Sequence, residues 1–185
     1  MRFRPATPAD KWDVFAWRNT TRVRQAMLTQ HLITADEHAA WWDRKQADPD
    51  FHMMLLDEDG ITKAVQIFFN GSTSGSIWWA FYFTPNAPQD MGAMLHFWKK
   101  TELSGLAYAF DHLNCTRLVC EVLRSNSGVL NWHKRFGFEE CDPSISENAE
   151  HYDLEVMDFS RDKYLLKKEK HWADDIGEIE IARPE

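Results

Sequence analysis

The chain has 185 residues, of which 44% are hydrophobic and 27% are charged. These values are typical of one globular domain that can bury a core without disulfides or metals. The formal net charge is −8, but residues 1–140 carry 15 basic against 16 acidic side chains, whereas residues 141–185 carry 6 against 13. Nucleic-acid binding needs clustered Lys and Arg, so the composition argues against a nucleic-acid partner.

The cysteines and the N-terminus indicate the cellular compartment. Cys115, Cys120 and Cys141 are an odd number without metal-ligand spacing, which is typical of free thiols in a reducing compartment. Residues 1–7 include charges where a signal peptide needs an apolar run. No apolar run approaches the roughly 18 residues that a membrane span needs. We therefore expect a cytoplasmic protein with no metal and no membrane partner.

The first part of the chain predicts a strand followed by two helices. Residues 1–6 fit a short strand. Thr7 and Pro8 are typical of a helix start, and this helix would end near position 19. Thr34 and Glu37, three residues apart, form a capping box for a second helix that would end near position 46.

A meander of antiparallel strands follows these helices. Aromatic and β-branched residues fill Phe51–Leu56, Ala64–Asn70 and Ser76–Thr84. Polar, glycine-containing turns separate them at 57–60 and 70–75. The three strands would therefore lie side by side in one sheet.

The second half continues with alternating helices and strands. Apolar spacing predicts a helix over 90–113. Residues 116–122 predict a strand, in which Cys120 and Glu121 point to opposite faces. The remaining segments are a helix over 126–135 that stops at Gly137, a strand over 151–159, a basic amphipathic piece over 161–172 and an acidic tail over 173–185. This order predicts a mixed α/β fold, with one domain over 1–159 and a C-terminal extension over 160–185.

A glycine-containing helix start follows the meander. It reads Gln89, Asp90, Met91, Gly92, Ala93, Met94. A glycine there lets the backbone approach a ligand, and the unpaired amides of a helix N-terminus favour an anion. The alternative is that Gly92 only packs against a neighbour.

The ordered set of Gln89 with Gly92, then Glu121, Asn126, His133 and Gly137-Phe138, resembles the Gcn5-related N-acetyltransferase (GNAT) family. The resemblance implies a single mixed, mostly antiparallel sheet flanked by helices, with splayed central strands and acetyl-CoA as co-substrate. The implied CoA-binding residues are Phe81, Tyr82 and Phe83 for pantetheine, Gln89, Gly92, Ala93 and Met94 for pyrophosphate, and Asn126. Met94 departs from the small residue that is usual at its position.

The resemblance also implies two catalytic residues. His133 stands where the family has a Tyr that protonates the leaving thiolate, and an imidazole can donate a proton at neutral pH. The alternative is that His133 only forms a hydrogen bond. Glu121 stands where a carboxylate can take a proton from the amine, directly or through water. The alternative for Glu121 is a salt bridge to Arg117 or Arg124.

A narrower resemblance lies in the N-terminal half, where Trp17-Arg18-Asn19, Val23-Arg24 and the run from Ile33 to Trp41 look like the branch that acetylates amines of nucleotide-activated sugars. The substrate-binding residues that it implies are Arg18, Asn19, Arg24, His31, His38, Trp41 and Trp79. Arg22 belongs to the same basic group, and arginine forks suit a diphosphate. Solvent-exposed arginines and core-filling aromatic rings are the alternatives.

These residues predict an N-acetyltransferase that transfers acetyl to a small-molecule amine, such as a nucleotide-activated amino sugar. A first rival is an acetyltransferase that acts on a protein or ribosomal protein. A second rival is a non-catalytic binding module of the same fold, because the family's Tyr is missing. The sequence leaves a homodimer open.

Overall fold

The structure is a computed structural model that describes residues 1–70 and 75–182. Most of the turn predicted at 70–75 lies outside these ranges. No helix of the described part is long and apolar enough to cross a bilayer.

All described strands belong to one sheet, in the order β6-β7-β5-β4-β3-β2-β1-β8. Their bounds are β1 Arg2–Pro5, β2 Phe51–Glu58, β3 Ile61–Asn70, β4 Ser76–Phe83, β5 Arg117–Leu123, β6 Glu139–Glu140, β7 Leu154–Ser160 and β8 Glu180–Ile181. Only the β4–β5 and β1–β8 pairs are parallel. The predicted mixed, mostly antiparallel sheet is confirmed.

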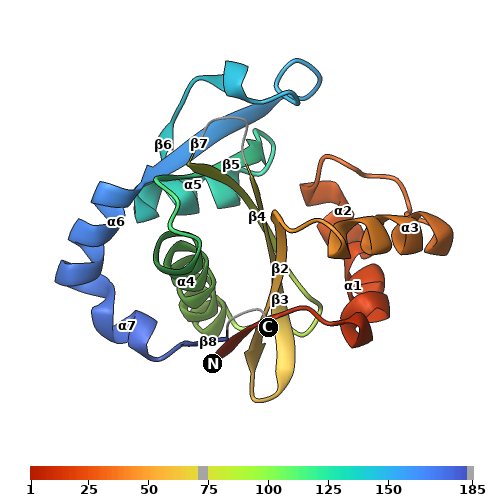
Figure 1. Ribbon diagram of the computed structural model, residues 1–185, viewed down its shortest axis with the longest axis horizontal. Coiled ribbons are helices and arrows are strands. Elements are labelled where there is room, and N and C mark those ends of the chain that lie inside the picture. Colours follow the sequence, from red (N-terminus) through yellow and green to blue (C-terminus); the bar gives the residue numbers. More distant parts are fainter. Residues whose placement is uncertain (71–74, 183–185) are drawn as a thin grey trace.

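Helices cover both faces of the sheet. Figure 1 shows α1, α2 and α3 on one side and α4 on the other. The helices are α1 Lys11–Arg18, α2 Thr21–Ala26, α3 Ala35–Gln46, α4 Met91–Ala107, α5 Ser127–Phe136, α6 Arg161–Lys167 and α7 Ala173–Gly177. The 3₁₀ turns are η1 Pro8–Asp10 and η3 Pro143–Ile145, and the π-helical turns are η2 Tyr108–His112 and η4 Lys168–Trp172.

The predicted elements are present, and several short ones are added. The Thr34–Glu37 capping box is confirmed, since Glu37 N donates to Thr34 Oγ1 at 3.2 Å and Thr34 N donates to Glu37 Oε2 at 2.7 Å. The helix predicted over 90–113 is divided into α4 and η2. The sequence did not predict α2, β6, α7 or β8, which are too short to give a clear periodic pattern.

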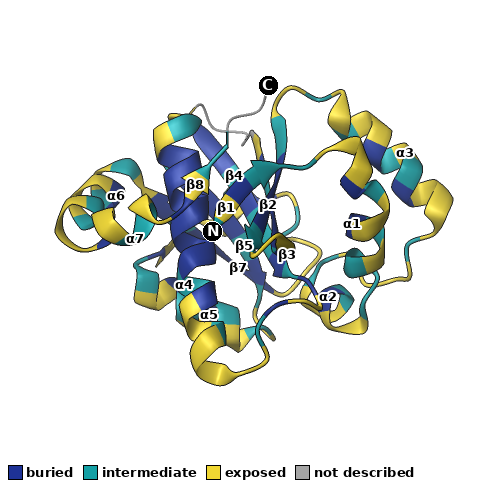
Figure 2. Cartoon of the chain, turned by 90° about the horizontal axis from the view of Figure 1, so that it is seen from below, coloured by how far each residue is buried: buried dark blue, intermediate teal, exposed yellow. Residues whose placement is uncertain are grey.

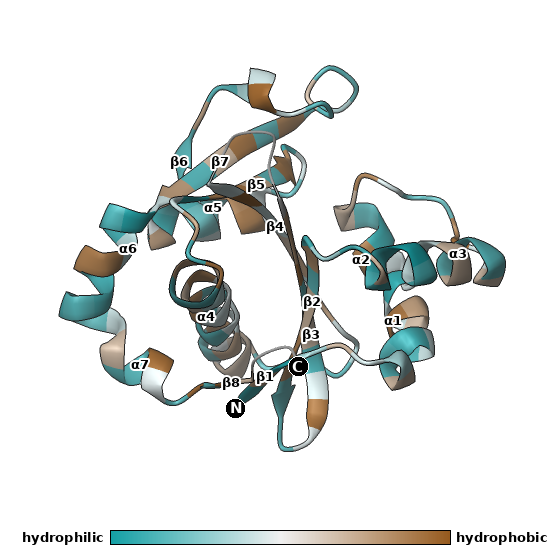
Figure 3. Cartoon of the chain, viewed as in Figure 1, coloured by the Kyte–Doolittle hydropathy of each residue, from teal (hydrophilic) through white to brown (hydrophobic). Residues whose placement is uncertain are grey.

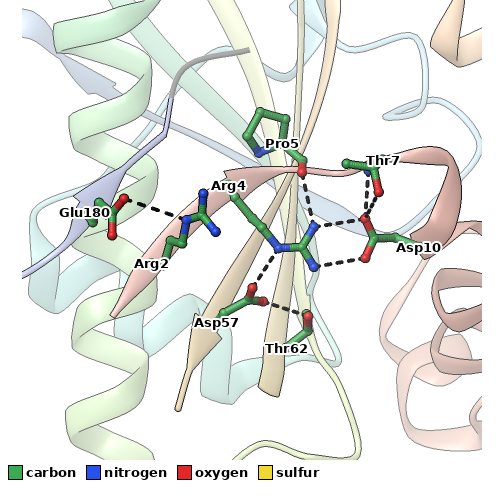
Figure 4. A network of polar contacts seen from close by, with 8 residues as sticks. All are labelled: Arg2, Arg4, Pro5, Thr7, Asp10, Asp57, Thr62 and Glu180. Atoms are coloured by element: carbon green, nitrogen blue, oxygen red, sulfur yellow. Dashed lines mark hydrogen bonds and ion pairs between the residues drawn. The ribbon is translucent and has the colours of Figure 1, made fainter. Parts of the chain in front are cut away.

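A half-buried arginine, Arg4, ties the first strand to its surroundings (Figure 4). Arg4 Nε donates to Asp57 on β2 at 2.7 Å, and its two Nη atoms donate to Asp10 at 2.9 Å each. Asp57 also accepts from Thr62 on β3 at 2.7 Å. Bidentate arginine–carboxylate pairs fix geometry as well as charge, so Arg4 positions the entry to α1 relative to the sheet.

The two faces of the sheet bury cores of different size. The larger cluster lies between the sheet and α4, and it includes Phe68, Leu103, Phe110, Phe159 and Tyr164. The smaller cluster lies under α1–α3, around Val14, Val23, Trp42, Leu55 and Tyr82. Figure 2 shows α4 largely buried, whereas α3 has a broad exposed surface.

The C-terminal extension packs on the larger core. Trp172 stacks on Phe136 with ring centroids 5.6 Å apart, and β8 pairs with β1 as the last strand of the sheet. Lys100 on α4 forms ion pairs with Asp175 and Glu178. Two of the 13 acidic residues in 141–185 are therefore paired with α4. On α6 the apolar residues Leu165 and Leu166 are exposed within an otherwise hydrophilic helix (Figure 3).

The central strands separate at one end. In the described part of the chain, β4 and β5 pair only from Ser76–Arg117 to Trp78–Val119. Beyond Trp78, β4 continues to Phe83 beside β3, while β5 continues to Leu123 beside β7. This separation confirms the predicted splayed central strands.

Candidate active site

A cavity of about 380 Å³ lies where β4 and β5 separate. Its lining residues are Arg22, Val23, Gln25, Ala26 and Met27 of the α2 region, Trp79–Phe83 of β4, Trp98 of α4, Cys120–Val122 of β5, and Ser125, Asn126, Val129 and His133 of the β5–α5 segment. Volumes of this size hold small ligands. The cavity therefore brings together Glu121, His133, Asn126 and Phe81–Phe83, all of which the sequence had singled out.

The β5 residues that line the cavity point alternately to the two faces of the sheet. Cys120 and Val122 belong to the core on the α4 side, whereas Val119 belongs to a cluster on the opposite side. Glu121 therefore points to the face opposite Cys120. This arrangement confirms the predicted alternation of side chains along the strand. Side chains from both faces of the sheet therefore line the gap between β4 and β5.

Glu121 is half-buried and held by neutral donors. Asn148 Nδ2 donates to its two carboxylate oxygens at 3.2 and 3.0 Å, and the Ser146 hydroxyl also donates to Oε1. Arg117 pairs instead with Asp158, and Arg124 pairs with Asp153 and Glu155. The Glu121 carboxylate is thus positioned by hydrogen bonds at the cavity wall, and the alternative salt bridges are absent.

His133 is buried at the opposite side of the cavity and forms a close pair with Glu102. Its Nδ1 atom lies 2.5 Å from Glu102 Oε1, and the two side chains are 2% and 0% exposed. Burial lowers the pKa of His133, but the Glu102 charge and the neighbouring Cys120 outweigh it, so the pKa is raised. The raised pKa favours the protonated imidazole, which is the form that can donate a proton to a group in the cavity.

Glu102 was not predicted as a functional residue. It lies on α4, 31 residues before His133, and its other oxygen has no hydrogen-bond partner among residues 1–70 and 75–182. The only signal in the sequence was a carboxylate within a helix segment of otherwise small and apolar residues, Thr101 to Leu106, where a charged residue needs a partner.

Aromatic side chains enclose the imidazole. The rings of Trp79, Phe81 and Phe138 lie 5.5, 5.9 and 4.7 Å from that of His133. Trp79, which the sequence assigned to the substrate, is 2% exposed, and its indole nitrogen donates to Gln66 at 3.0 Å. Its ring therefore packs in the core at the inner wall of the cavity, on the same face as His133.

A glycine allows this core to close. A Cβ atom on Gly105 of α4 would lie 2.7 Å from Gln66 Oε1 and 2.9 Å from the Trp79 ring. Gln66 Nε2 in turn donates to the Thr101 carbonyl and the Ser104 hydroxyl. The α4 helix can therefore approach β3 and β4 closely enough to bring Glu102 to His133.

The predicted phosphate-binding residues lie at the exposed N-terminus of α4. Asp90 caps this helix, and its carboxylate accepts from Ala93 N at 3.0 Å. Met94 N donates to the Asp90 carbonyl at 2.8 Å, and Gln89 donates to the Ala87 carbonyl at 2.8 Å. The exposed helix terminus leaves room for an anion. However, the negatively charged Asp90 carboxylate already accepts a hydrogen bond from one of the terminal amides, that of Ala93.

Asn126 lies at the start of α5, beside the same cavity. Its backbone carbonyl accepts from Val129 and Leu130 at 3.1 and 3.2 Å, which begins the helix that carries His133. Gly137 ends this helix with φ of +111°, a conformation that favours glycine. The helix is thus fixed at both ends.

A second cavity, of about 260 Å³, lies on the α1–α3 side of the sheet. Among its lining residues are Arg18, His31, Glu37, His38, Trp41 and Tyr82. Arg18 Nη1 and the Tyr82 hydroxyl are buried there without a hydrogen-bond partner in the described part of the chain. Burial lowers the pKa of the Arg18 guanidinium and raises that of the Tyr82 hydroxyl.

The other N-terminal residues have internal partners. Asn19 exchanges two hydrogen bonds of 2.9 Å with the backbone of Ile33. Arg24 donates to the carbonyls of Asn19 and Gln30 at 3.2 and 2.9 Å. These two side chains therefore hold the loop between α2 and α3. Arg22, which lines the first cavity, is the residue of this basic group that faces it.

The two histidines that line the second cavity, His38 and His31, differ in exposure and in their contacts. His38 is 3% exposed, its Nε2 atom lies 2.8 Å from the Lys11 carbonyl, and burial lowers its pKa. His31 is exposed beside Glu37 at the rim. His38 thus joins α3 to α1, while His31 is exposed and Trp41 is half-buried against His38 and Phe51.

Within residues 1–70 and 75–182, no group of three or more His, Cys, Asp or Glu side chains is placed to hold a metal ion. The three cysteines are free thiols.

Neither a protein-family model nor a curated protein sequence matches the chain. Among solved structures, 288 chains match. One is a spermidine N-acetyltransferase from Vibrio cholerae in complex with CoA and spermine, with a TM-score of 0.70, 16% identity, and coverage of 88% of this chain and 96% of that one. Another is a ribosomal-protein-alanine N-acetyltransferase from Brucella melitensis, with a TM-score of 0.62, 19% identity, and coverage of 85% and 98%.

These matches establish the fold. The sequence identities are low, but each structural match covers at least 85% of both chains. The chain therefore has the GNAT fold, an α/β architecture with one mixed sheet flanked by helices, as the sequence predicted.

Proposed function

We propose that the protein is an acetyl-CoA-dependent N-acetyltransferase that acts on the amine of a small molecule. The observation that carries this proposal is the position of Glu121 and His133 on opposite faces of the sheet, both lining the gap between β4 and β5. A proton acceptor on one side and a proton donor on the other are what amide formation from a thioester requires.

The reaction would proceed by amine attack on the thioester carbonyl. Glu121, directly or through water, takes the proton of the attacking amine. A backbone N–H near Tyr82, on the edge of β4 that β5 has left, stabilises the oxyanion. His133 then gives its proton to the departing CoA thiolate, and Glu102 stabilises the imidazolium that serves as this donor.

Acetyl-CoA, the acetyl donor, would be held by the CoA-binding residues that the sequence resemblance implies. The pantetheine arm pairs with the free edge of β4 over Phe81–Phe83, and the pyrophosphate meets the N-terminus of α4 at Gly92, Ala93 and Met94. Asp90 weakens this second contact, because its carboxylate competes for the Ala93 amide. The CoA-bound relative supports the choice of donor.

For the acceptor we favour an amine that also carries an acidic group, such as a nucleotide-activated amino sugar. Arg22 lines the first cavity, and Arg18 lines the second with one nitrogen unpaired in the described residues. Cations next to the site repel a polyamine and attract phosphate or carboxylate. Trp41 supplies an aromatic wall on which a base or sugar ring can stack.

The two rival functions differ in what they need. A protein acceptor, as in the ribosomal-protein relative, requires a groove for an extended peptide, whereas the two cavities have volumes of about 380 and 260 Å³ and are partly lined by arginine. A non-catalytic module has no need for a protonated imidazole held by a buried carboxylate. Both rivals predict no turnover with small amino sugars.

Steady-state rates with acetyl-CoA and a panel of amines test the proposal. The panel compares UDP- and dTDP-linked amino sugars with spermidine and with an N-terminal peptide. We expect turnover with an anionic amine, and a loss of about 10²- to 10⁴-fold in kcat for Glu121→Gln. Near wild-type turnover in both Glu121→Gln and His133→Ala would show that the assigned roles are wrong.

A further inference from the structure

Two buried polar atoms at the second cavity have no hydrogen-bond partner among the described residues. They are Nη1 of Arg18, the last residue of α1, and the hydroxyl of Tyr82 on β4. Both side chains line this cavity of about 260 Å³, and Tyr82 is 6% exposed. A buried donor without a partner costs free energy, and a ligand that pairs with it recovers that cost.

The rest of the Arg18 guanidinium is fixed. Its Nη2 atom donates to the Thr29 carbonyl at 3.0 Å, and Arg18 forms no ion pair within residues 1–70 and 75–182. Glu37 also lines the cavity, but Thr34 N donates to its carboxylate at 2.7 Å and His31 lies 3.3 Å from it. The Arg18 charge is therefore available to an anion, and the Glu37 charge disfavours an anion with more than one negative charge.

The Tyr82 side chain connects this cavity with the candidate active site. Burial raises the pKa of its hydroxyl, which therefore stays protonated and can donate. Tyr82 belongs to the core under α1–α3, on the face of the sheet to which Glu121 points and opposite to Cys120. Tyr82 also lines the cavity between β4 and β5, so the two cavities share it as a wall.

We propose that the second cavity is an anchoring subsite in which Arg18 Nη1 and the Tyr82 hydroxyl bind a singly charged oxyanion of the acceptor, a carboxylate or one phosphate of a diphosphate. This inference rests on the proposed function for the amine. The acceptor spans both cavities, with its amine beside Glu121 and its acidic end beside Arg18. The Tyr82 side chain thereby determines specificity, in addition to the pantetheine contact proposed for its backbone.

The size of the second cavity suits one end of an acceptor. Its volume is below the roughly 300–1,000 Å³ of pockets that enclose whole ligands. Val14, Ile33, Met53 and Ile67 give it apolar surface for carbon atoms or a ring. Because the amine and the acidic group lie in different cavities, we expect them to be separated by several bonds, unlike those of an α-amino acid.

Initial rates at saturating acetyl-CoA test the subsite. One series compares ω-amino carboxylates, from glycine to aminooctanoate, with alkylamines of the same carbon number. A second compares a UDP-linked amino sugar with the same sugar without UDP. We expect kcat/KM to favour the acidic member at least about 10-fold once the acceptor spans both cavities, and Arg18→Gln and Tyr82→Phe each to reduce this preference to about twofold or less. The series that shows the preference identifies the carboxylate or the phosphate as the anchored group.

Stability without ligand separates a recognition role of the Tyr82 hydroxyl from a structural one. Tyr82→Phe removes a hydroxyl that has no partner in the described part of the chain, so the urea midpoint should stay at or above that of the wild type. The matched control is Tyr164→Phe, which removes a hydroxyl that donates to Asp111 at 2.6 Å and should lower the midpoint. An equal fall in both variants would show that the Tyr82 hydroxyl has a structural role, and would overturn the subsite.

The outcomes separate this inference from the proposed function. Acetyl transfer without a preference for acidic acceptors, or with a preference that survives in both variants, would overturn the subsite and leave the function intact. If no amine is acetylated, the proposed function fails, and thermal shifts with hexanoate and with UDP then decide the subsite. A rise in the wild-type Tm with either probe that is lost in Arg18→Gln supports it, whereas no rise, or an equal rise in the variant, overturns it.

Discussion

The two faces of the sheet differ in how their buried polar groups are satisfied. On the α4 side, His133 pairs with Glu102, and aromatic rings surround it. On the α1–α3 side, Arg18 Nη1 and the Tyr82 hydroxyl lack hydrogen-bond partners among the described residues. The buried imidazole of the first face therefore has a carboxylate partner within the protein, although Glu102 Oε2 has no second partner among the described residues, whereas Arg18 on the second face has no ion-pair partner among them.

This difference separates chemistry from recognition. A proton donor must hold its pKa and its position, and a tightly packed core with a fixed counter-charge provides both. Recognition of an acceptor gains most from buried donors whose hydrogen bonds form only when the ligand arrives. Each of the following changes tests whether the two faces differ in this way.

The largest expected effect is on folding, from His133→Ala. Removal of the imidazole leaves the Glu102 charge buried and unpaired, which costs about 3–5 kcal/mol in the free energy of unfolding. Arg18→Gln on the other face removes a hydrogen bond to the Thr29 carbonyl and should cost about 1–2 kcal/mol. Urea denaturation at neutral pH measures both.

A double variant isolates the pair. Glu102→Gln together with His133→Ala leaves no buried charge, so it should be more stable than His133→Ala alone. Equal stability of the double variant and His133→Ala would show that the His133–Glu102 pair is not ionic.

The next largest effect is on the pH dependence of kcat in Glu102→Gln. In the wild type, the Glu102 charge raises the pKa of His133, so the proton-donating form exists at low pH and is lost as pH rises through that raised pKa. Without this charge, the lowering effect of burial dominates. The alkaline limb of kcat should move to lower pH by about 1 unit or more.

The matched control is Glu155→Gln, which removes another buried carboxylate, paired with Lys134 and Arg124 and outside the residues that line the cavity. Its alkaline limb should stay at the wild-type pH. Coincident profiles for Glu102→Gln and the wild type would exclude His133 as the group whose titration limits kcat.

The sequence predicted the local features of the site well. Period-two alternation assigned Cys120 and Glu121 to opposite faces, and the facing of their neighbours confirms it. Thr34 and Glu37 identified the start of α3, because a capping box depends only on residues three positions apart.

Features that depend on distant contacts were missed. The role of Glu102 arises only because α5 brings His133 beside α4, and that contact has no local pattern. Residues 21–26 contain one buried apolar side chain, Val23, which is too little for an amphipathic pattern, so α2 was not predicted. The capping role of Asp90 was also missed, although the sequence alone could have predicted it, since an Asp before a helix is a common N-cap.

A smaller effect is expected at the second face, on acceptor binding. If Arg18 Nη1 pairs with an acidic group of the acceptor, Arg18→Gln should raise KM for that acceptor about 10-fold and leave kcat nearly unchanged. Initial rates at saturating acetyl-CoA measure this. An amine without an acidic group serves as the control, and an equal rise in its KM would mean that Arg18 acts through the loop at Thr29.

The smallest effect is expected at the N-terminus of α4, from Asp90→Ser. The serine keeps the helix cap but removes a negative charge beside the amides proposed for the pyrophosphate. The Kd for CoA should fall about threefold at low ionic strength, and the gain should shrink in high salt. Isothermal titration calorimetry at two salt concentrations measures this change in Kd.

The control is Asp142→Ser, which removes a similar cap on η3, away from the cavity, and should leave Kd unchanged. Weaker CoA binding by Asp90→Ser would mean that the carboxylate shapes the loop for the ligand and does not compete with it.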